Sequence, residues 1–432
     1  MIVSLPLVAT AAALRSGQLD LLTLIDDVCK RIDAHEPAIH ALVPELGRRA
    51  RLLNEATALQ KRFPDPGSRP PLYGMLLGVK DIFHADGFPT RAGSQLPPEV
   101  LRGAEASCVT KLRDAGALLL GKTVTTEFAY FEPGPTRNPH NLDHTPGGSS
   151  SGSAAAVTMG FCPIALGTQT IGSVIRPAAF CGIVGFKPSY GRIATDGLIL
   201  CAASLDTIGF FTQDVAGIAL VASLLCKDWR PTVSDGKPVL GVPDGPYLAH
   251  ASPEGRAAFE RHVTLLEKAG YRVHHIEAMQ DIDAIALRHR QMVAAEMAQV
   301  HATWFAMYES LYRPRTSALI QQGQEVSPEE LAIARPRRAV LRGELEGLMA
   351  QYGIDLWISP AAPGPAPEGI TTTGDPIMNL PWTHAGLPAI ALPAGCAANG
   401  LPLGLQVVGA FMADEQLVSW AEPMAEVLSK EE

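Results

Sequence analysis

Three segments of the chain combine residue types that could carry out chemistry. Residues 147–156 form a glycine- and serine-rich run, and residues 167–178 form a second glycine-containing run that includes Ser173. Lys80 directly follows the apolar run 75–79. A serine becomes a nucleophile when a base lies within hydrogen-bond reach. The three segments together therefore indicate nucleophilic catalysis by serine.

Residues 147–156 are typical of a loop that enters a helix, where backbone N–H groups face a ligand. A phosphate-binding loop is excluded, because that motif needs a lysine after its last glycine and this run has none. A flexible linker is disfavoured, because the alanines 154–156 favour continuation of a helix.

Ser173 lies at the end of a turn that follows the apolar residues 164–166. A serine at that place can expose its hydroxyl while consecutive backbone N–H groups converge on one point, as in an oxyanion hole. Lys80, carried inward by an apolar strand, loses its hydration. Desolvation lowers a lysine pKa and makes the neutral amine available as a base.

Other catalytic arrangements lack their motifs. The chain has no G-x-S-x-G nucleophile turn, and none of its 12 histidines lies at a metal-binding spacing such as H-E-x-x-H. Lysine is therefore the better partner for the serine, and we expect neither a metal nor an organic cofactor.

The composition, with 432 residues, 18% of them charged, and a net charge of −9, is typical of a soluble globular protein of the size of many enzymes. An acidic balance argues against a nucleic-acid or anionic-membrane surface, since both favour dense Lys and Arg. The 7 cysteines form no C-x-x-C pair, which indicates free thiols. We expect no secretory signal and no spanning helix, and hence a cytoplasmic location.

The apolar patterning predicts one large α/β domain over residues 1–432, with a mixed twisted sheet covered by helices. Residues 72–225 alternate short apolar runs with glycine turns and helical stretches. Residues 250–350 read as a helical insertion, which is expected to start at Ser252-Pro253. The last eighty residues again show the apolar patterning of an α/β fold, with a strand expected at 356–359 and a Pro/Gly-rich loop at 360–374.

Several long motifs, in this order along the chain, resemble the amidase signature family, whose members cleave carboxylic amides with a serine–serine–lysine triad. The resemblance covers most of the chain and is densest between residues 72 and 211. It is carried by Gly121-Lys122-Thr123, the runs 147–156 and 167–178, Gly185-Phe186-Lys187-Pro188-Ser189, Ser204-Leu205-Asp206-Thr207-Ile208-Gly209 and Leu401-Pro402-Leu403-Gly404-Leu405-Gln406.

The resemblance implies a role for each residue of the triad. Ser173 matches the nucleophile, Lys80 the base and Ser149 the bridging serine, which in the family follows a cis peptide bond, here Gly148–Ser149. Ser149 and Ser173 lie 24 positions apart, as the family pattern requires.

The resemblance further implies that the N–H groups of Thr170, Ile171, Gly172 and Ser173 bind the oxyanion. Ser150 and Ser151 are expected to support the loop as donors behind the triad.

Two departures from the family pattern point toward the substrate. Ile171 replaces a usual glycine, so we expect a narrower pocket. The arginine that commonly stands two residues after the nucleophile stands three residues after it, as Arg176, and Gln169 replaces a common aspartate. This variant is similar to malonamidases, in which the matching arginine binds the substrate carboxylate. The alternative is a structural ion pair of Arg176, for example with Asp206 or Asp81.

The sequence therefore predicts an amidohydrolase acting through an acyl-enzyme on a small amide that bears a carboxylate, such as malonamate. One alternative is a carbamate, urea-type or aryl amide hydrolase with the same triad. A second is the amidase subunit of a tRNA-dependent amidotransferase, and a third is an inactive scaffold. The expected partner is a small-molecule amide, without nucleic acid or membrane, and the chain could form a homodimer.

Overall fold

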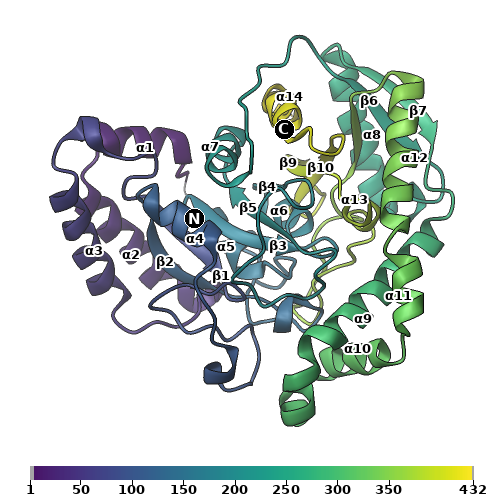
Figure 1. The fold of residues 1–432 in the computed structure, drawn as a ribbon. Coiled ribbons are helices and arrows are strands. Elements are labelled where there is room, and N and C mark those ends of the chain that lie inside the picture. The colour runs from purple at the N-terminus through teal and green to yellow at the C-terminus, as the bar shows by residue number, and fades with distance from the viewer. Residues whose placement is uncertain (1–3, 431–432) are drawn as a thin grey trace.

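A ten-stranded mixed β-sheet runs through the part of the chain that the computed structural model describes, residues 4–430 (Figure 1). Its strand order is β2-β1-β3-β5-β4-β9-β10-β8-β6-β7. The strands are β1 (Leu76–Lys80), β2 (Leu118–Thr123), β3 (Ile164–Gln169), β4 (Val184–Lys187), β5 (Thr207–Thr212), β6 (Val239–Asp244), β7 (Arg272–Glu277), β8 (Leu356–Pro360), β9 (Ala389–Cys396) and β10 (Pro402–Val408). The predicted α/β class with a mixed sheet is confirmed.

The sheet consists of two halves that are contiguous in sequence. Strands β1 to β5 form one half and β6 to β10 the other, and β4 joins β9 in antiparallel register, with Phe186 opposite Ile390. Parallel pairs lie toward the two ends of the sheet, whereas the pairs in the middle are antiparallel. Residues 72–225 thus supply one complete half of the sheet.

Helices cover the sheet over residues 4–430. They are α1 (Leu7–Ser16), α2 (Leu21–Ile39), α3 (Arg48–Arg62), α4 (Ser107–Asp114), α5 (Ser151–Thr158), α6 (Ile175–Cys181), α7 (Val215–Leu225), α8 (Pro253–Lys268), α9 (Ile282–Tyr308), α10 (Pro314–Gln324), α11 (Pro328–Ala334), α12 (Arg337–Tyr352), α13 (Leu380–Ala385) and α14 (Asp414–Leu428). Helices α5 and α6 pack on the strands, and every residue of both is buried.

The packing of α5 explains its small residues. A Cβ atom on Gly152 would lie 2.1 Å from the carbonyl oxygen of Ala41 and 2.4 Å from the backbone nitrogen of Val124. Only glycine permits this approach of helix and backbone. The serine–glycine run therefore forms the start of a deeply buried helix.

The segment 250–350 is helical apart from β7, which pairs in parallel with β6 at the edge of the sheet. Helix α8 begins as predicted: Pro253 is its first residue, and the Ser252 hydroxyl accepts a hydrogen bond from the Gly255 N–H at 3.1 Å. Helices α9 to α12 form a group of their own at the right of Figure 1, and α9 also contacts α13.

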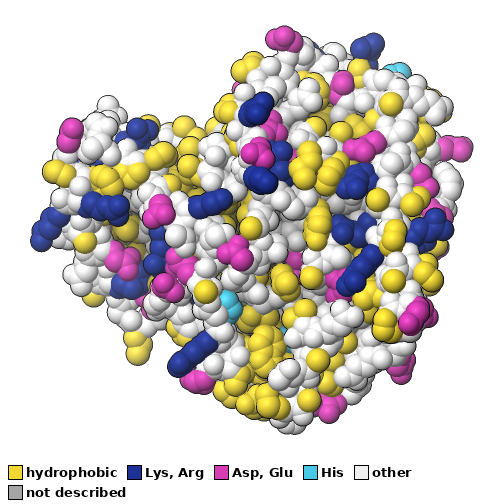
Figure 2. Space-filling model, in the orientation of Figure 1, with side chains coloured by type: hydrophobic (Ala, Val, Ile, Leu, Met, Phe, Trp, Pro, Cys, Tyr) yellow, Lys and Arg dark blue, Asp and Glu magenta, His cyan; other side chains and the backbone are white. Residues whose placement is uncertain are grey.

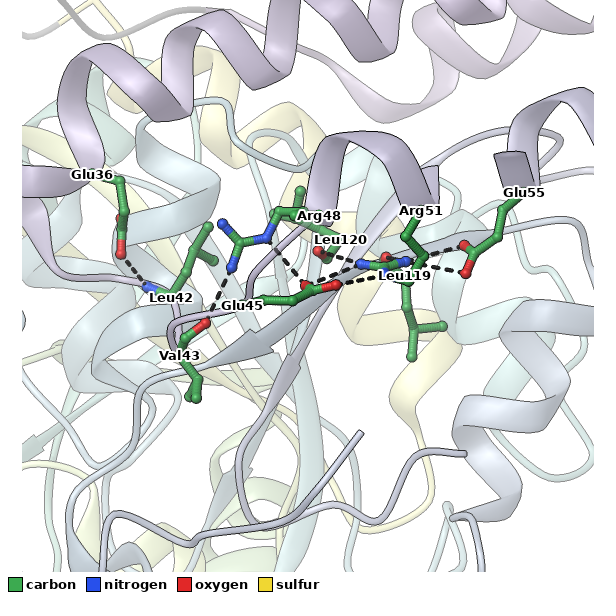
Figure 3. Close-up of polar contacts among 9 residues, drawn as sticks. All are labelled: Glu36, Leu42, Val43, Glu45, Arg48, Arg51, Glu55, Leu119 and Leu120. Carbon is green, nitrogen blue, oxygen red and sulfur yellow. Dashed lines mark hydrogen bonds and ion pairs between the residues drawn. The ribbon is translucent and has the colours of Figure 1, made fainter. Parts of the chain in front are cut away.

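The sheet edge at β2 is covered. Arg51 of α3 donates to the carbonyl oxygens of Leu119 and Leu120 at 2.9 and 3.1 Å, and ion pairs with Glu45 and Glu55 hold its guanidinium (Figure 3). The Val43 N–H donates to the carbonyl of the strand residue Lys122 at 2.8 Å. An uncovered edge strand would offer these carbonyls to another chain.

No helix among residues 4–430 is long and apolar enough to cross a membrane. The visible face in Figure 2 carries acidic and basic side chains interspersed with one another. The cysteines have free thiols, and all except Cys396 are buried.

Candidate active site

Lys80 is the last residue of β1, a strand that is buried along its whole length between β2 and β3. Its Nζ donates to the hydroxyl of Ser149 at 2.7 Å and to that of Thr168 at 2.8 Å. Burial lowers the pKa of Lys80 to about 7, and the nearby carboxylate of Asp206 opposes that shift. A large fraction of this amine is therefore neutral near pH 7.

Ser149 follows a cis peptide bond from Gly148, as the resemblance implied. The carbonyl oxygen of Gly148 accepts a hydrogen bond from Nη2 of Arg176 at 2.6 Å, and the carbonyl of Ser149 accepts one from the Thr126 N–H at 3.2 Å. Both sides of the unusual turn are thus tied to other segments.

The two serines that follow bond to backbone groups of β3 and of the residue after β2. The Ser150 hydroxyl donates to the carbonyl of Thr168 and accepts from its N–H, both at 3.3 Å. The Ser151 hydroxyl donates to the Val124 carbonyl at 3.4 Å. Both hydroxyls are directed to the backbone, so Ser149 is the serine that the structure brings to the lysine.

The turn at residues 170–173 joins β3 to α6. Gln169 supports it from below: its Oε1 accepts from the N–H groups of Val174 and Ile175 at 2.8 and 3.0 Å. A Cβ atom on Gly172 would lie 2.4 Å from Oδ1 of Asn379. Glycine is therefore required at position 172, whereas the Ile171 side chain fits in the wall of the pocket.

Several of these groups line one pocket. Its lining includes Ser149, Ser173, Arg176 and Thr373. Its remaining wall is largely apolar and consists of Ala129, Tyr130, Phe131, Thr170, Ile171, Gly172, Cys201, Val293 and Pro376. A lining of apolar side chains with a few polar groups is typical of sites that bind small molecules.

Arg176 forms neither of the structural ion pairs considered from the sequence. Asp81 instead pairs with Lys122 at 2.7 Å. Asp206 accepts from the hydroxyl of Thr170 and from the N–H groups of Cys201 and Ala202. Both carboxylates have other partners, so Arg176 forms neither of these two ion pairs.

Arg176 is 1% exposed, and only part of its guanidinium is bonded within residues 4–430. Nη2 donates to the Gly148 carbonyl and, at 3.1 Å, to the Thr373 hydroxyl, whereas Nε and Nη1 are buried without a partner among the described residues. Burial lowers the pKa of Arg176 to about 10, with Asp375 opposing the shift, so the group stays charged at neutral pH.

Within residues 4–430 no group of three or more His, Cys, Asp or Glu side chains is arranged to hold a metal ion.

The family model described as Amidase matches residues 23–418. The chain belongs to the amidase family. It is an enzyme of the hydrolase class that acts on amide C–N bonds, and its fold is that of the solved amidases.

Named relatives and solved structures match over nearly the whole length. The glutamyl-tRNA(Gln) amidotransferase A-subunit of Oleidesulfovibrio alaskensis is 31% identical, with 98% of this chain and 97% of the relative covered. A crystal structure of an amidase matches with a TM-score of 0.87 at 30% identity, over 98% of this chain and 99% of that one. The native peptide amidase from Stenotrophomonas maltophilia matches with a TM-score of 0.83 at 26% identity, over 99% and 97% of the two chains.

Sequence reasoning missed the residues that reach the site from helices α9 and α13. Val293 of α9 lines the pocket, and His289 of the same helix contacts the backbone of Thr170. Thr383 of α13 donates to the carbonyl of Ile171 at 2.7 Å. No sequence motif includes these residues, because their roles depend on contacts with the turn 170–173 or the pocket that form only when the chain folds.

Proposed function

We propose that this amidase-family enzyme hydrolyses a small amide bearing a carboxylate, through an acyl-enzyme on Ser173. Lys80 is the base, Ser149 the proton relay and Arg176 the carboxylate-binding group. The observation that carries the proposal is the buried Arg176 guanidinium, which lines the same pocket as Ser149 and Ser173 and has Nε and Nη1 unpaired among the described residues.

The reaction begins with neutral Lys80, whose nitrogen takes the proton of the Ser149 hydroxyl while Ser149 takes that of Ser173. The Ser173 Oγ bonds to the amide carbon, and the N–H groups of Thr170, Ile171, Gly172 and Ser173 stabilise the oxyanion. The proton returns from Lys80 through Ser149 to the leaving nitrogen as the C–N bond breaks. Water then attacks the ester by the same relay and releases the acid.

The short contact from Lys80 to Ser149 supports this sequence of proton transfers. A base is most effective when its pKa lies near the working pH, and burial places the pKa of Lys80 at about 7. Ser173 lines the same pocket as Ser149.

The carboxylate role of Arg176 follows from the cost of an unpaired buried donor. A substrate carboxylate would accept a hydrogen bond from Nη1 or from Nε, whose N–H groups lie on different edges of the guanidinium and are both unpaired among the described residues. The remaining nitrogen, Nη2, keeps the Gly148 carbonyl in place.

The test is ammonia release from malonamate and from butanamide, a neutral amide of similar size. The wild type is compared with Arg176→Gln, which removes the positive charge and keeps a polar side chain. We expect the wild type to prefer malonamate and the variant to lose about 10²–10³-fold in kcat/KM on malonamate alone, as expected for a buried charge pair. An equal loss on both amides, or equal wild-type rates on both, would show that Arg176 is structural.

Such an outcome would favour the other use of the same triad, on a carbamate, a urea-type compound or an aryl amide. Those substrates carry no carboxylate, so the wild type would then hydrolyse phenyl carbamate or acetanilide faster than malonamate, and Arg176→Gln would lower all rates together.

A second candidate function is participation in a tRNA-dependent amidotransferase. Relatives named as glutamyl-tRNA(Gln) amidotransferase A-subunits are 29–31% identical over 94–98% of this chain. Their name implies tRNA-linked chemistry, so the expectation of no nucleic-acid partner stays a prediction, as does a homodimer. The test is ammonia release from glutamine by the purified chain, with malonamate as the comparison. Activity on glutamine that requires added partner proteins would favour the amidotransferase.

A further inference from the structure

Two buried histidines lie directly behind the turn that carries Ser173. His289 of α9 and His384 of α13 are both 0% exposed, and their Nδ1 atoms lie 3.2 Å apart. The other ring nitrogen of His289, Nε2, lies 3.1 Å from the carbonyl oxygen of Thr170. The pair thus connects α13 through α9 to the first residue of the turn.

The contacts decide which nitrogens carry protons. A carbonyl oxygen can only accept, so Nε2 of His289 is the protonated nitrogen. Burial lowers the pKa of His289 well below its ordinary value and that of His384 to about 3, and the cation of Arg338 favours the neutral form of each. In neutral His289, Nδ1 is therefore an acceptor, and Nδ1–H of His384 donates to it.

The carbonyl of Thr170 shares its peptide unit with the N–H of Ile171. In a trans peptide the C=O and N–H point in opposite directions, and the only cis bond among residues 4–430 is Gly148–Ser149. A donor that holds the Thr170 carbonyl toward α9 consequently directs the Ile171 N–H away from α9.

The next two peptide units are held in the same manner. The Ile171 carbonyl accepts from the Thr383 hydroxyl at 2.7 Å, and the Gly172 carbonyl accepts from the Arg176 N–H at 3.1 Å. Three consecutive carbonyls are tied to the protein, which leaves the N–H groups of Ile171, Gly172 and Ser173 directed away from those partners. These three residues line the pocket.

We propose that His289 is a positioning residue for the oxyanion hole: its Nε2–H orients the Thr170–Ile171 peptide, and His384 fixes the tautomer in which His289 can donate. The inference rests on the proposed role of residues 170–173 in binding an oxyanion. It differs from the action of Lys80, because neither imidazole touches the substrate or exchanges a proton with it.

The matched variants are His289→Phe, which keeps a ring and loses the donor, and His289→Gln, which restores an N–H donor. His384→Phe leaves His289 free to adopt the other tautomer. His301→Gln is the control, because His301 is a buried histidine of the same helix whose Nδ1 bonds to the Tyr312 hydroxyl at 2.9 Å rather than to the turn.

The measurement is the second-order rate constant for covalent labelling by a fluorophosphonate, whose phosphoryl oxygen occupies an oxyanion hole. It is read beside kcat and KM on malonamate and the melting temperature of each variant. We expect His289→Phe to slow labelling and kcat by about 10–100-fold, with KM within about threefold, since loss of a complete donor costs about 10²–10³ in kcat. His289→Gln should recover most of the rate, His384→Phe should lose about three- to tenfold, and His301→Gln should stay within twofold.

Labelling of His289→Phe at the wild-type rate would overturn the inference, as would equal losses in His289→Gln and His289→Phe at equal melting temperatures. If His289→Phe does not fold, the labelling rate constant and kcat of His289→Gln and His384→Phe test the inference instead. Labelling that persists in Ser173→Ala would instead overturn the proposed function. The two results are distinguishable: the labelling rate tests the role of His289, whereas the identity of the labelled residue tests the proposed role of Ser173.

Discussion

Lys80 and Lys187 occupy equivalent places in two different strands. Each is the last residue of its strand, β1 or β4, and each is 0% exposed. Burial lowers the pKa of each to about 7, and one nearby carboxylate opposes the shift, Asp206 for Lys80 and Asp414 for Lys187. Burial and pKa therefore do not distinguish the two amines.

Their hydrogen-bond partners do distinguish them. Lys80 faces the hydroxyls of Ser149 and Thr168, which can both accept and donate protons. Lys187 faces the backbone carbonyls of Leu387 and Pro188, at 2.5 and 2.9 Å, which can only accept. A lysine with a depressed pKa becomes a base when its partner can pass on a proton, and otherwise supports the backbone.

Replacing each lysine by methionine should separate the catalytic role of Lys80 from the structural role of Lys187 most clearly. We expect Lys80→Met to lose about 10³–10⁴-fold in kcat/KM at pH 7.5, the range of a general base. Lys187→Met should keep activity within about threefold and lose about 2–4 kcal/mol of stability, because two buried carbonyls lose their donor. Ammonia release and denaturant unfolding measure the two effects, and activity of Lys80→Met within tenfold of wild type would contradict the proton relay.

The two lysines should affect stability alike as the pH changes. Between pH 7 and 10.5 the unfolded chain binds a proton at each lysine that the folded chain does not. The free energy of unfolding therefore rises with pH across this window, by about 1.4 kcal/mol per pH unit for each group. Urea unfolding at pH 7.5 and 9.5 should show this slope reduced equally in Lys80→Met and Lys187→Met. A reduction in only one variant would show that the two amines are not equally depressed.

Thr168→Val should weaken the Lys80 site without removing the base. The change keeps the shape of the side chain and removes the hydroxyl that accepts from Nζ at 2.8 Å. We expect kcat to fall about three- to tenfold, because the amine is less well oriented toward Ser149. Thr212→Val, at a buried threonine on β5, is the control. An unchanged kcat in Thr168→Val would show that Ser149 alone orients the lysine.

Asp206→Asn should produce the smallest change. The carboxylate opposes the shift of the Lys80 pKa, so its removal lowers that pKa below about 7. The acid limb of the pH–activity profile, where Lys80 loses its proton, should move to lower pH. Asp414→Asn should act on Lys187 in the same way and leave that limb in place. If the acid limb moves in both variants, it reflects the titration of a group other than Lys80.

The sequence predicted the chemical groups of the site better than their surroundings. A lysine after an apolar strand suggested Lys80, but Lys187 meets the same criterion, and only the resemblance to a family separated the two. The resemblance also predicted the cis bond at Gly148–Ser149. The partners of Arg176 could not be predicted, because Gly148 and Thr373 lie 28 and 197 positions away and contribute a carbonyl and a hydroxyl without a motif.

The fold class was predictable from alternating apolar runs, whereas the order of the strands was not. Strand β9 pairs with β4 across about two hundred residues of chain, and β7 lies within a segment that reads as helical. His289 escaped notice for a related reason: a buried histidine on a helix has no distinguishing pattern until Thr170, 119 positions away, is folded against it.

The junction between β4 and β9 has a consequence for synthesis of the chain. When residues 76–212 leave the ribosome, β1 to β5 can form their half of the sheet, but the partner of β4 is not made until residues 389–396. During that interval β4 exposes unpaired N–H and C=O groups, which other nascent chains can bind. Chaperone demand and aggregation in a heterologous host should therefore depend most on how fast residues 213–396 are translated.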